Sequence, residues 1–257
     1  MVWEQDRRIP YFCFAYIMKE KLVIVPTYNE AENIEELVAV VMALDYPFDM
    51  LVVDDDSPDG TAQLVEALQP KYKDCLHLLK RPTKEGLGPA YLEAFQWALD
   101  RNYQYLFEMD ADFSHDPYDL TKLYDMLQKD KADVVVGSRY VRGIQVINWT
   151  LSRILLSYFA SLYVRLITRM PIKDTTAGFV GYKKEVIQAI TNENIRFSGY
   201  AFQIEMKFKA WVKNFRLKEI PVVFTDRTRG VSKMNRSIIS EAIFGIILMK
   251  IKSWYAK

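Results

Sequence analysis

Short apolar runs alternate with longer mixed segments between residues 22 and 137. The runs are rich in Val, Leu, Ile and Phe, which is typical of buried strands. We predict five strands, at residues 22–26, 50–54, 76–80, 105–109 and 133–137. The segments between them are interpreted as helices, with the clearest at residues 30–43 and 87–100. This alternation predicts an α/β fold with a mainly parallel sheet and helices on both faces.

Two of the intervening helices carry a start signal. Ser57 precedes Pro58, and Asp116 precedes Pro117. Ser or Asp at the cap and Pro in the first turn favour a helix start, because Pro lacks the N–H group that a first turn leaves unpaired. We therefore expect one helix to open at residue 57 and another at residue 116.

The pattern changes after Gly143, where we expect a long apolar helix over 147–170 and a last amphipathic helix over 237–255. Both combine apolar runs with basic and aromatic residues, as helices in a bilayer interface do. Packing against the main domain explains the same pattern, and the sequence leaves both interpretations open. We find no run of about 18 apolar residues, the length that a membrane-spanning helix needs.

The chain is predicted to contain an N-terminal extension at 1–20, one catalytic domain at 21–236 and the terminal helix at 237–257. Its 257 residues have a formal net charge of +1, which argues against a nucleic-acid partner. The two cysteines, Cys13 and Cys75, do not form a disulfide framework, so a reducing, cytoplasmic compartment is expected.

Acidic residues follow two of the predicted strands. Asp110 and Asp112 are separated by one small residue, a spacing at which two carboxylates can share a hard divalent cation with a nucleotide diphosphate. Residues 54–56 are three consecutive Asp, one of which could accept hydrogen bonds from a nucleobase or ribose. Ligands in such sheets bind beyond the carboxyl ends of the strands, so these residues mark the expected site.

Eight segments occur in a characteristic order: VPTYNE, VVDDDSPDG, EGLGPAY, MDADFSH, GSRY, DTTAGF, SGYAFQIEM and a basic loop at 227–233. Together they resemble the polyprenol-phosphate and dolichyl-phosphate mannosyltransferases, which are inverting glycosyltransferases of the GT-A class. The resemblance covers roughly residues 21–236 and implies the GT-A, or nucleotide-diphospho-sugar transferase, fold.

The resemblance also implies a role for each matching residue. The guanosine pocket would comprise Pro26, Tyr28, Glu30, Val53 and Asp55. The diphosphate would be bound through Mg²⁺ or Mn²⁺ by Asp110, Ala111 and Asp112, with Asp110 and Asp112 as metal ligands. The family often has Gln as a further ligand two residues on, where this chain has Ser114.

The remaining implied residues are basic or lie near the sugar. Arg139 matches the family's arginine after the fifth strand and is expected to be catalytic, together with Asp110, Asp112 and Arg153. Arg227 and Lys233 match a basic loop that closes over the nucleotide-sugar phosphates, and Arg153 matches an acceptor-phosphate arginine on the long helix. A second basic position of many relatives is Tyr158 here. Asp174 falls in a loop near the sugar, where it could bind a hydroxyl or hold the loop rigid.

The implied reaction transfers mannose from GDP-mannose to a polyprenyl phosphate at the cytoplasmic face of the membrane, with inversion to a β-linked product. The acceptor phosphate is already anionic, so no general base is required. A polyprenyl-phosphate glucosyltransferase that uses UDP-glucose is the alternative within enzymes. A non-catalytic sugar-nucleotide-binding protein is an alternative of a different class. A nucleotidyltransferase is a third possibility, but the Gly- and Lys-rich phosphate loop that usually follows the first strand of such enzymes is absent from this sequence.

Overall fold

The computed structural model describes residues 20–193, 195–199, 201–226 and 245–253. The predicted N-terminal extension, apart from residue 20, and the basic residues Arg227 and Lys233 lie outside these ranges. Within the described ranges one seven-stranded sheet has the order β3-β2-β1-β4-β7-β5-β8, and β6 and β9 form a separate pair.

The five predicted strands are present, and four short strands complete the two sheets. The strands are β1 (Lys21–Thr27), β2 (Asp49–Asp54), β3 (Leu76–Lys80), β4 (Tyr105–Glu108), β5 (Val134–Ser138), β6 (Val146–Ile147), β7 (Val180–Lys183), β8 (Leu217–Pro221) and β9 (Phe224–Thr225). The helices are α1 (Ala31–Met42), α2 (Thr61–Leu68), α3 (Leu87–Asp100), α4 (Asp119–Gln128), α5 (Leu151–Thr168), α6 (Lys184–Thr191) and α7 (Ala201–Val212). Strand β7 is antiparallel to both of its neighbours, β4 and β5.

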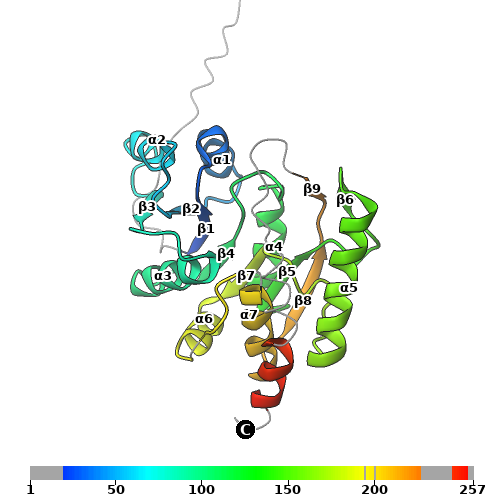
Figure 1. The fold of residues 1–257 in the computed structure, drawn as a ribbon. Helices are drawn as coiled ribbons and strands as arrows, with labels where there is room; N and C mark the ends of the chain where they lie inside the picture. Colours follow the sequence, from blue (N-terminus) through cyan, green and yellow to red (C-terminus); the bar gives the residue numbers. More distant parts are fainter. Residues whose placement is uncertain (1–19, 194, 200, 227–244, 254–257) are drawn as a thin grey trace, which may run out of the picture.

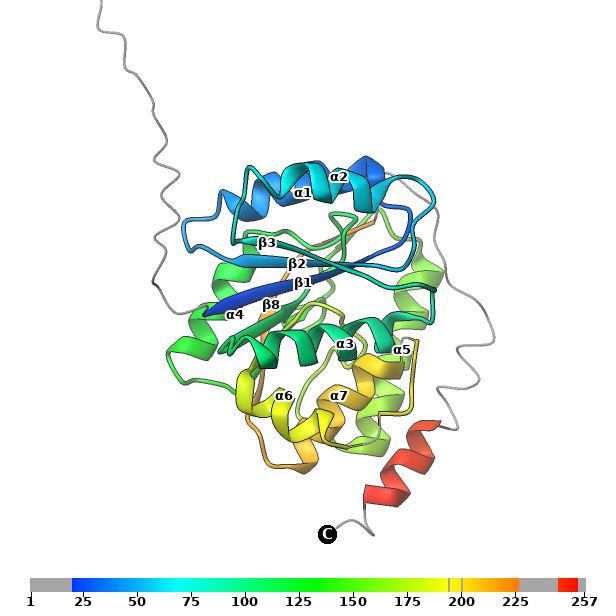
Figure 2. The ribbon, with the colours of Figure 1, turned by 90° about the vertical axis from the view of Figure 1, so that its left-hand side faces the viewer.

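Helices cover both faces of the sheet, as predicted. Figure 2 shows α1 and α2 along one face and α3, α6 and α7 along the other. Each face has its own apolar core: Val23 and Val25 of β1 point into the cluster with α1 and α4, whereas Leu22 and Ile24 point into the cluster with α3 and α7. This alternation is the pleat of a strand that is buried on both faces.

Two helices begin a few residues after their predicted starts. Helix α2 begins at Thr61 instead of residue 57, because Ser57 donates its hydroxyl and main-chain N–H groups to Asp54 and so closes a turn after β2. Helix α4 begins at Asp119, three residues after the predicted start. Asp116 still caps the turn that leads into it, because its side chain accepts the N–H of Tyr118 and its carbonyl accepts the N–H of Asp119, both at 3.0 Å. Short polar side chains that bond to nearby backbone stabilise turns as readily as helix caps.

Pro26 lies in a central strand, where a missing N–H group usually breaks the ladder. Strand β1 pairs with β4 only as far as Ile24, whose carbonyl accepts the N–H of Met109. Two residues after Ile24, the main-chain groups of Pro26 point to the same side, towards β4, but Pro26 lies beyond the last residue pair between β1 and β4. Its missing donor therefore costs no ladder bond.

The segment EGLGPAY starts α3 through a close backbone contact. Gly86 has φ of +107°, and a Cβ on Gly88 would lie 2.5 Å from the carbonyl oxygen of Phe197. The N–H of Gly88 donates to the carbonyl of Ser198 at 2.8 Å. The two glycines thus allow a tight turn into α3, and they let the segment before α7 pack against the start of that helix.

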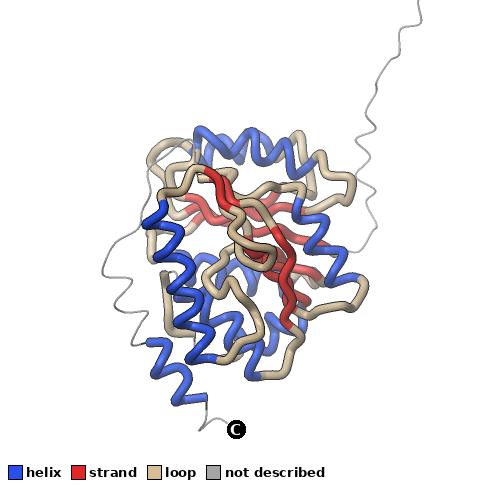
Figure 3. Tube along the Cα trace, turned by 90° about the vertical axis from the view of Figure 1, so that its right-hand side faces the viewer, coloured by secondary structure: helices blue, strands red, loops and turns tan. Residues whose placement is uncertain are grey.

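The long helix differs from its predicted range of 147–170, since Val146–Ile147 pair with β9 and the helix begins at Leu151. At 18 residues, α5 is long and apolar enough to cross a membrane by length and composition, and only 17% of it is buried. Residues 245–253 of the predicted last helix are helical. Figures 1 and 3 show them near the carboxyl-terminal end of α5, on the side of the molecule away from α2 and β3.

We predict that Gly181→Ala destabilises the protein by about 1–3 kcal/mol, because overpacking a tight core displaces its neighbours. A Cβ at this position of β7 would lie 2.8 Å from the buried ring of Phe107. Gly178→Ala is the control, since a Cβ there would meet nothing within 4 Å. Urea denaturation measures both variants, and equal midpoints would contradict the packing argument.

Candidate active site

The acid turn, residues Asp110 to His115, follows β4 at the edge where the parallel strands end. The Asp110 side chain is 41% exposed, whereas Asp112 is buried and accepts the N–H of Ser114 at 3.0 Å. The carbonyl of Ser114 accepts the N–H of Thr225 in β9 at 3.1 Å. The turn therefore presents one partly exposed carboxylate and one buried carboxylate, and β9 holds it in place.

His115, the last residue of the acid turn, packs its ring against two aromatic side chains. Its ring stacks on Phe179 with centroids 4.9 Å apart and meets the edge of Phe224 at 5.2 Å. The main-chain N–H of Asp110 donates to its Nδ1 at 3.5 Å. Burial lowers the pKa of His115 to about 4, although Asp112 acts in the opposite direction. The imidazole is therefore neutral near pH 7 and serves as a packed hydrogen-bond acceptor.

Of the three consecutive Asp residues at the end of β2, the first two, Asp54 and Asp55, have different roles. Asp54 is 1% exposed and accepts from the hydroxyls of Thr27 and Ser57, at 2.9 and 2.6 Å, so it closes the junction between β1 and β2. Asp55 turns to the other side and pairs with Arg81, whose Nη1 lies 2.5 Å from Asp55 Oδ1. Burial raises the pKa of Asp55, and Arg81 opposes this shift.

Arg81 was not among the predicted site residues. It is 5% exposed and donates to Asp55, Glu85 and Glu93, so its guanidinium is surrounded by three carboxylates. In the sequence it looks like a surface charge after a short strand. Only the packing of β3 beside β2 shows that it holds Asp55 in place.

The other residues predicted for the nucleoside lie close to Asp55. Pro26 and Val53 are opposite each other in the β1–β2 ladder. The ammonium group of Lys84 lies 3.7 Å from the ring centroid of Tyr28. Glu30 accepts the side-chain N–H of Asn33 at 3.0 Å. The sheet thus brings this predicted set to one end of β1 and β2.

Arg139 is buried, and its contacts lie within the protein. Its Nε and Nη2 donate to the two carboxylate oxygens of Asp174 at 2.7 and 2.6 Å, and Nη2 also donates to Thr176. Asp174 has no exposed surface, and its own N–H donates to Glu219 of β8. Of the two roles that the sequence left open for Asp174, these contacts favour holding the loop.

Arg153 lies in the first turn of α5. Its Nη1 is 2.7 Å from Asp226 Oδ1, and its guanidinium lies 4.1 Å from the ring centroid of Trp149. Neither Trp149 nor Asp226 was predicted. The side chain of Arg153 is 36% exposed, so a phosphate can still reach it.

The donor set of the acid turn suits a hard divalent cation such as Mg²⁺ or Mn²⁺, because carboxylate oxygens are the ligands that these ions prefer. No group of three or more His, Cys, Asp or Glu side chains within the described residues converges on one point as a metal site would require. Two carboxylates, Asp110 and Asp112, are consistent with an ion that completes its shell with diphosphate and water.

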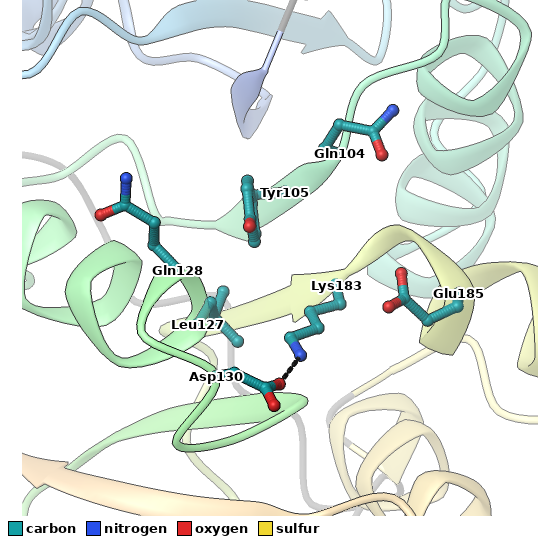
Figure 4. Close-up of a pocket in the computed structure, with 7 residues that line it drawn as sticks. All are labelled: Gln104, Tyr105, Leu127, Gln128, Asp130, Lys183 and Glu185. Carbon is teal, nitrogen blue, oxygen red and sulfur yellow. Dashed lines mark hydrogen bonds and ion pairs between the residues drawn. The ribbon is translucent and has the colours of Figure 1, made fainter.

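A shallow pocket of about 200 Å³ lies elsewhere, and Figure 4 shows its lining residues. It includes Tyr105, the first residue of β4, and the ion pair between Lys183 and Asp130. Tyr105 and Asp110 lie at opposite ends of β4, so this pocket is at the amino end of the parallel strands. It is therefore separate from the acid turn.

The profile of glycosyl transferase family 2 matches residues 22–191. The chain belongs to this family. The polyprenol monophosphomannose synthase of Mycolicibacterium smegmatis is 44% identical over 225 residues, which cover 88% of this chain and 84% of that protein. The undecaprenyl-phosphate mannosyltransferase of Micrococcus luteus is 39% identical over 225 residues, with coverages of 88% and 91%. The resemblance inferred from the eight segments is confirmed, and this family member is a glycosyltransferase.

Solved structures confirm the GT-A fold. Glucosyl-3-phosphoglycerate synthase of Mycobacterium tuberculosis, in complex with Mn²⁺, UDP-glucose and phosphoglyceric acid, aligns with a TM-score of 0.66 at 13% identity and covers 91% of this chain and 79% of that one. TarS of S. aureus in complex with UDP aligns with a TM-score of 0.61 at 21% identity, with coverages of 91% and 65%.

We predict that His115 makes the protein less stable as the pH falls from 6.5 to 4. The unfolded chain binds a proton below its ordinary pKa of 6.5, whereas the native imidazole does so only near 4, so acid favours unfolding over that window. The full effect is up to about 3 kcal/mol. His115→Gln should remove this component, which urea midpoints measured across the window would detect. Equal pH slopes in both proteins would contradict the assignment.

Proposed function

We propose that the protein transfers mannose from GDP-mannose to a polyprenyl phosphate, with inversion at the anomeric carbon. The names of the two relatives support mannose as the sugar and a polyprenyl phosphate as the acceptor. One structural observation carries the proposal: Thr225 of β9 bonds to the acid turn, and the next residue, Asp226, pairs with Arg153 in the first turn of α5. A carboxylate pair for the donor thus lies beside an arginine for the acceptor.

On the donor side, the predicted nucleoside residues bind GDP at the ends of β1 and β2. Asp55, fixed by Arg81, accepts hydrogen bonds from the N–H groups of guanine, and the ring of Tyr28 packs on the base. A carboxylate that is already paired on one edge loses little freedom when it binds a ligand. Pro26, Val53 and Glu30 complete this pocket.

Asp110 and Asp112 would hold Mg²⁺ or Mn²⁺, with Ala111 allowing the diphosphate to approach the backbone. When bound, the ion neutralises the charge that develops on the leaving diphosphate. The main-chain N–H of Ser114 donates a hydrogen bond to Asp112, so Ser114 would orient that carboxylate. Arg139 keeps the loop with Asp174 and Thr176 against the same edge, and Arg227 and Lys233 remain predicted phosphate contacts.

On the acceptor side, Arg153 binds the lipid phosphate. A phosphate oxygen of the acceptor attacks the anomeric carbon, the new C–O bond forms, and the bond from that carbon to the GDP oxygen breaks with its electron pair. Attack from the face opposite the leaving group converts an α-linked donor into a β-linked product. The phosphate is anionic near pH 7, so the site needs cations more than it needs a base.

The exposed face of α5 supports peripheral binding to a membrane surface. Leu151, Leu155, Leu156, Phe159 and Leu166 are 46–72% exposed and lie on one side of the helix. Ser161, Val164 and Thr168 on the opposite side are buried against the domain. Because one side packs on the protein, α5 lies along the bilayer interface with its apolar side toward the lipid. We place the enzyme on the cytoplasmic face.

A transfer assay tests this function. We predict that the wild type moves labelled mannose from GDP-mannose into an organic-solvent extract when polyprenyl phosphate and Mn²⁺ are present. Asp112→Asn should lower turnover by roughly a hundredfold or more, because the metal site loses charge, with an unchanged melting temperature. Labelled UDP-glucose is the parallel donor, and its preferential use would favour the glucosyltransferase. Full activity in EDTA would contradict the metal-dependent mechanism.

We predict a different result for Arg153→Ala. A lost charge-assisted contact to phosphate costs on the order of 1.5–3 kcal/mol, so the KM for a short-chain polyprenyl phosphate should rise roughly ten- to a hundredfold. The affinity for GDP, measured by calorimetry, should stay the same, and Arg165→Ala on the same helix serves as the control. Weaker GDP binding with unchanged acceptor kinetics would place Arg153 on the donor side.

A further inference from the structure

The indole ring of Trp149 lies beside two arginines of the site. Its centroid is 4.1 Å from the guanidinium carbon of Arg153 and 5.5 Å from that of Arg139. A guanidinium group within about 6 Å of an aromatic centroid is attracted by the negative face of the ring. One side chain therefore links Arg153, for which we propose a role at the acceptor phosphate, to an arginine that is buried in the domain.

The backbone on both sides of Trp149 holds its ring in place. Strand β6 pairs with β9 and ends two residues before the tryptophan, and Asn148 then turns the chain with φ of +62°. Asn adopts this left-handed region more readily than most residues do. One residue after the tryptophan, the hydroxyl of Thr150 accepts the main-chain N–H of Arg153 at 3.4 Å and caps α5. Trp149 thus lies between a paired strand and a capped helix.

The two arginines beside the ring differ in how firmly they are held. Arg139 is buried and donates to both carboxylate oxygens of Asp174. Phe224 of β9 meets the indole with centroids 5.2 Å apart and an interplanar angle of 72°. The side chain of Arg153 is 36% exposed. The indole is therefore packed against fixed groups, and its contact with Arg153 places the more exposed arginine relative to them.

Packing alone does not explain a tryptophan at this position. Its Nε1 is buried and has no hydrogen-bond partner among the residues that the structure describes. A buried N–H group without a partner costs free energy, which a phenylalanine ring would avoid. Among aromatic rings, however, the indole attracts a cation most strongly. The contact with the guanidinium group accounts for the choice of residue.

We infer that Trp149 is a positioning residue for the acceptor, which holds the guanidinium group of Arg153 in the orientation that receives the lipid phosphate. This inference rests on the proposed function. An arginine side chain loses rotamer freedom when it binds a phosphate, and a ring that fixes it beforehand removes part of that cost. The affinity for the acceptor should therefore depend on the ring, and it should do so only while Arg153 is present.

The first experiment measures the Kd of a short-chain polyprenyl phosphate by calorimetry, with GDP and Mn²⁺ present. Trp149→Leu should raise this Kd roughly five- to thirtyfold, the value of a desolvated cation–π contact, and Trp149→Phe should stay within about threefold of the wild type. In an Arg153→Ala background, Trp149→Leu should add less than about twofold, because the ring acts through that arginine. Trp211→Leu, at a ring of α7 that is 36% exposed, is the matched control and should leave the Kd unchanged.

A second measurement separates attraction of the charge from packing. Tryptophans that carry one, two or three fluorine atoms, inserted at position 149, keep nearly the same shape while they withdraw electron density from the ring face. The Kd for the polyprenyl phosphate should rise with each added fluorine, whereas the melting temperature should stay the same. This series also tests the inference if Trp149→Leu does not fold.

Three results would overturn the inference. An unchanged Kd across the fluorinated series would assign Trp149 to packing, and a falling Kd would show that the ring holds Arg153 away from the phosphate. An equal effect of Trp149→Leu with and without Arg153 would show that the ring acts through another group. A wild type that binds the lipid phosphate but transfers no mannose to it would overturn the proposed function instead and leave the role of Trp149 in binding intact.

Discussion

The ion pair between Arg139 and Asp174 is the contact on which one half of the site depends. Arg139 follows β5, Asp174 lies ahead of β7, and Glu219 of β8 accepts the N–H of Asp174. Three neighbouring strands are therefore joined at one edge. Because β7 is antiparallel, its leading loop lies at the edge where the parallel strands end. Breaking such a buried pair typically costs about 3–5 kcal/mol, so the loop has little freedom to move.

The sequence was sufficient for the first five strands and for placing the candidate site residues at one end of the sheet. Apolar runs identify strands that are buried on both faces, and acidic residues directly after them identify the ligand-binding edge. The sequence was not sufficient for β7, because its four residues include a glycine and are followed at once by a helix. It also could not separate Asp54 from Asp55, since only tertiary packing turns one toward Ser57 and the other toward Arg81.

The arginines of the described site share one arrangement, in which each is paired with a carboxylate. Arg81 binds Asp55, Arg139 binds Asp174, and Arg153 binds Asp226. The two buried guanidinium groups are thereby fixed in orientation, and their charge is largely balanced inside the protein. Bringing two anionic phosphates together then needs additional positive charge. A divalent cation at the acid turn would supply part of it, which agrees with the oxygen donors found there.

The acid turn and Arg153, for which we propose a role at the acceptor phosphate, are connected by a row of ring contacts. His115 meets Phe224 at 5.2 Å between centroids, Phe224 meets Trp149 at 5.2 Å, and Trp149 lies 4.1 Å from the guanidinium of Arg153. Rigid aromatic side chains have few rotamers, so such a row sets a distance with little entropic cost. The neutral state of His115 belongs to the same arrangement, since a charged imidazole in the row would repel Arg139 nearby. The separation between the acid turn and Arg153 is therefore determined by the packing of these rings.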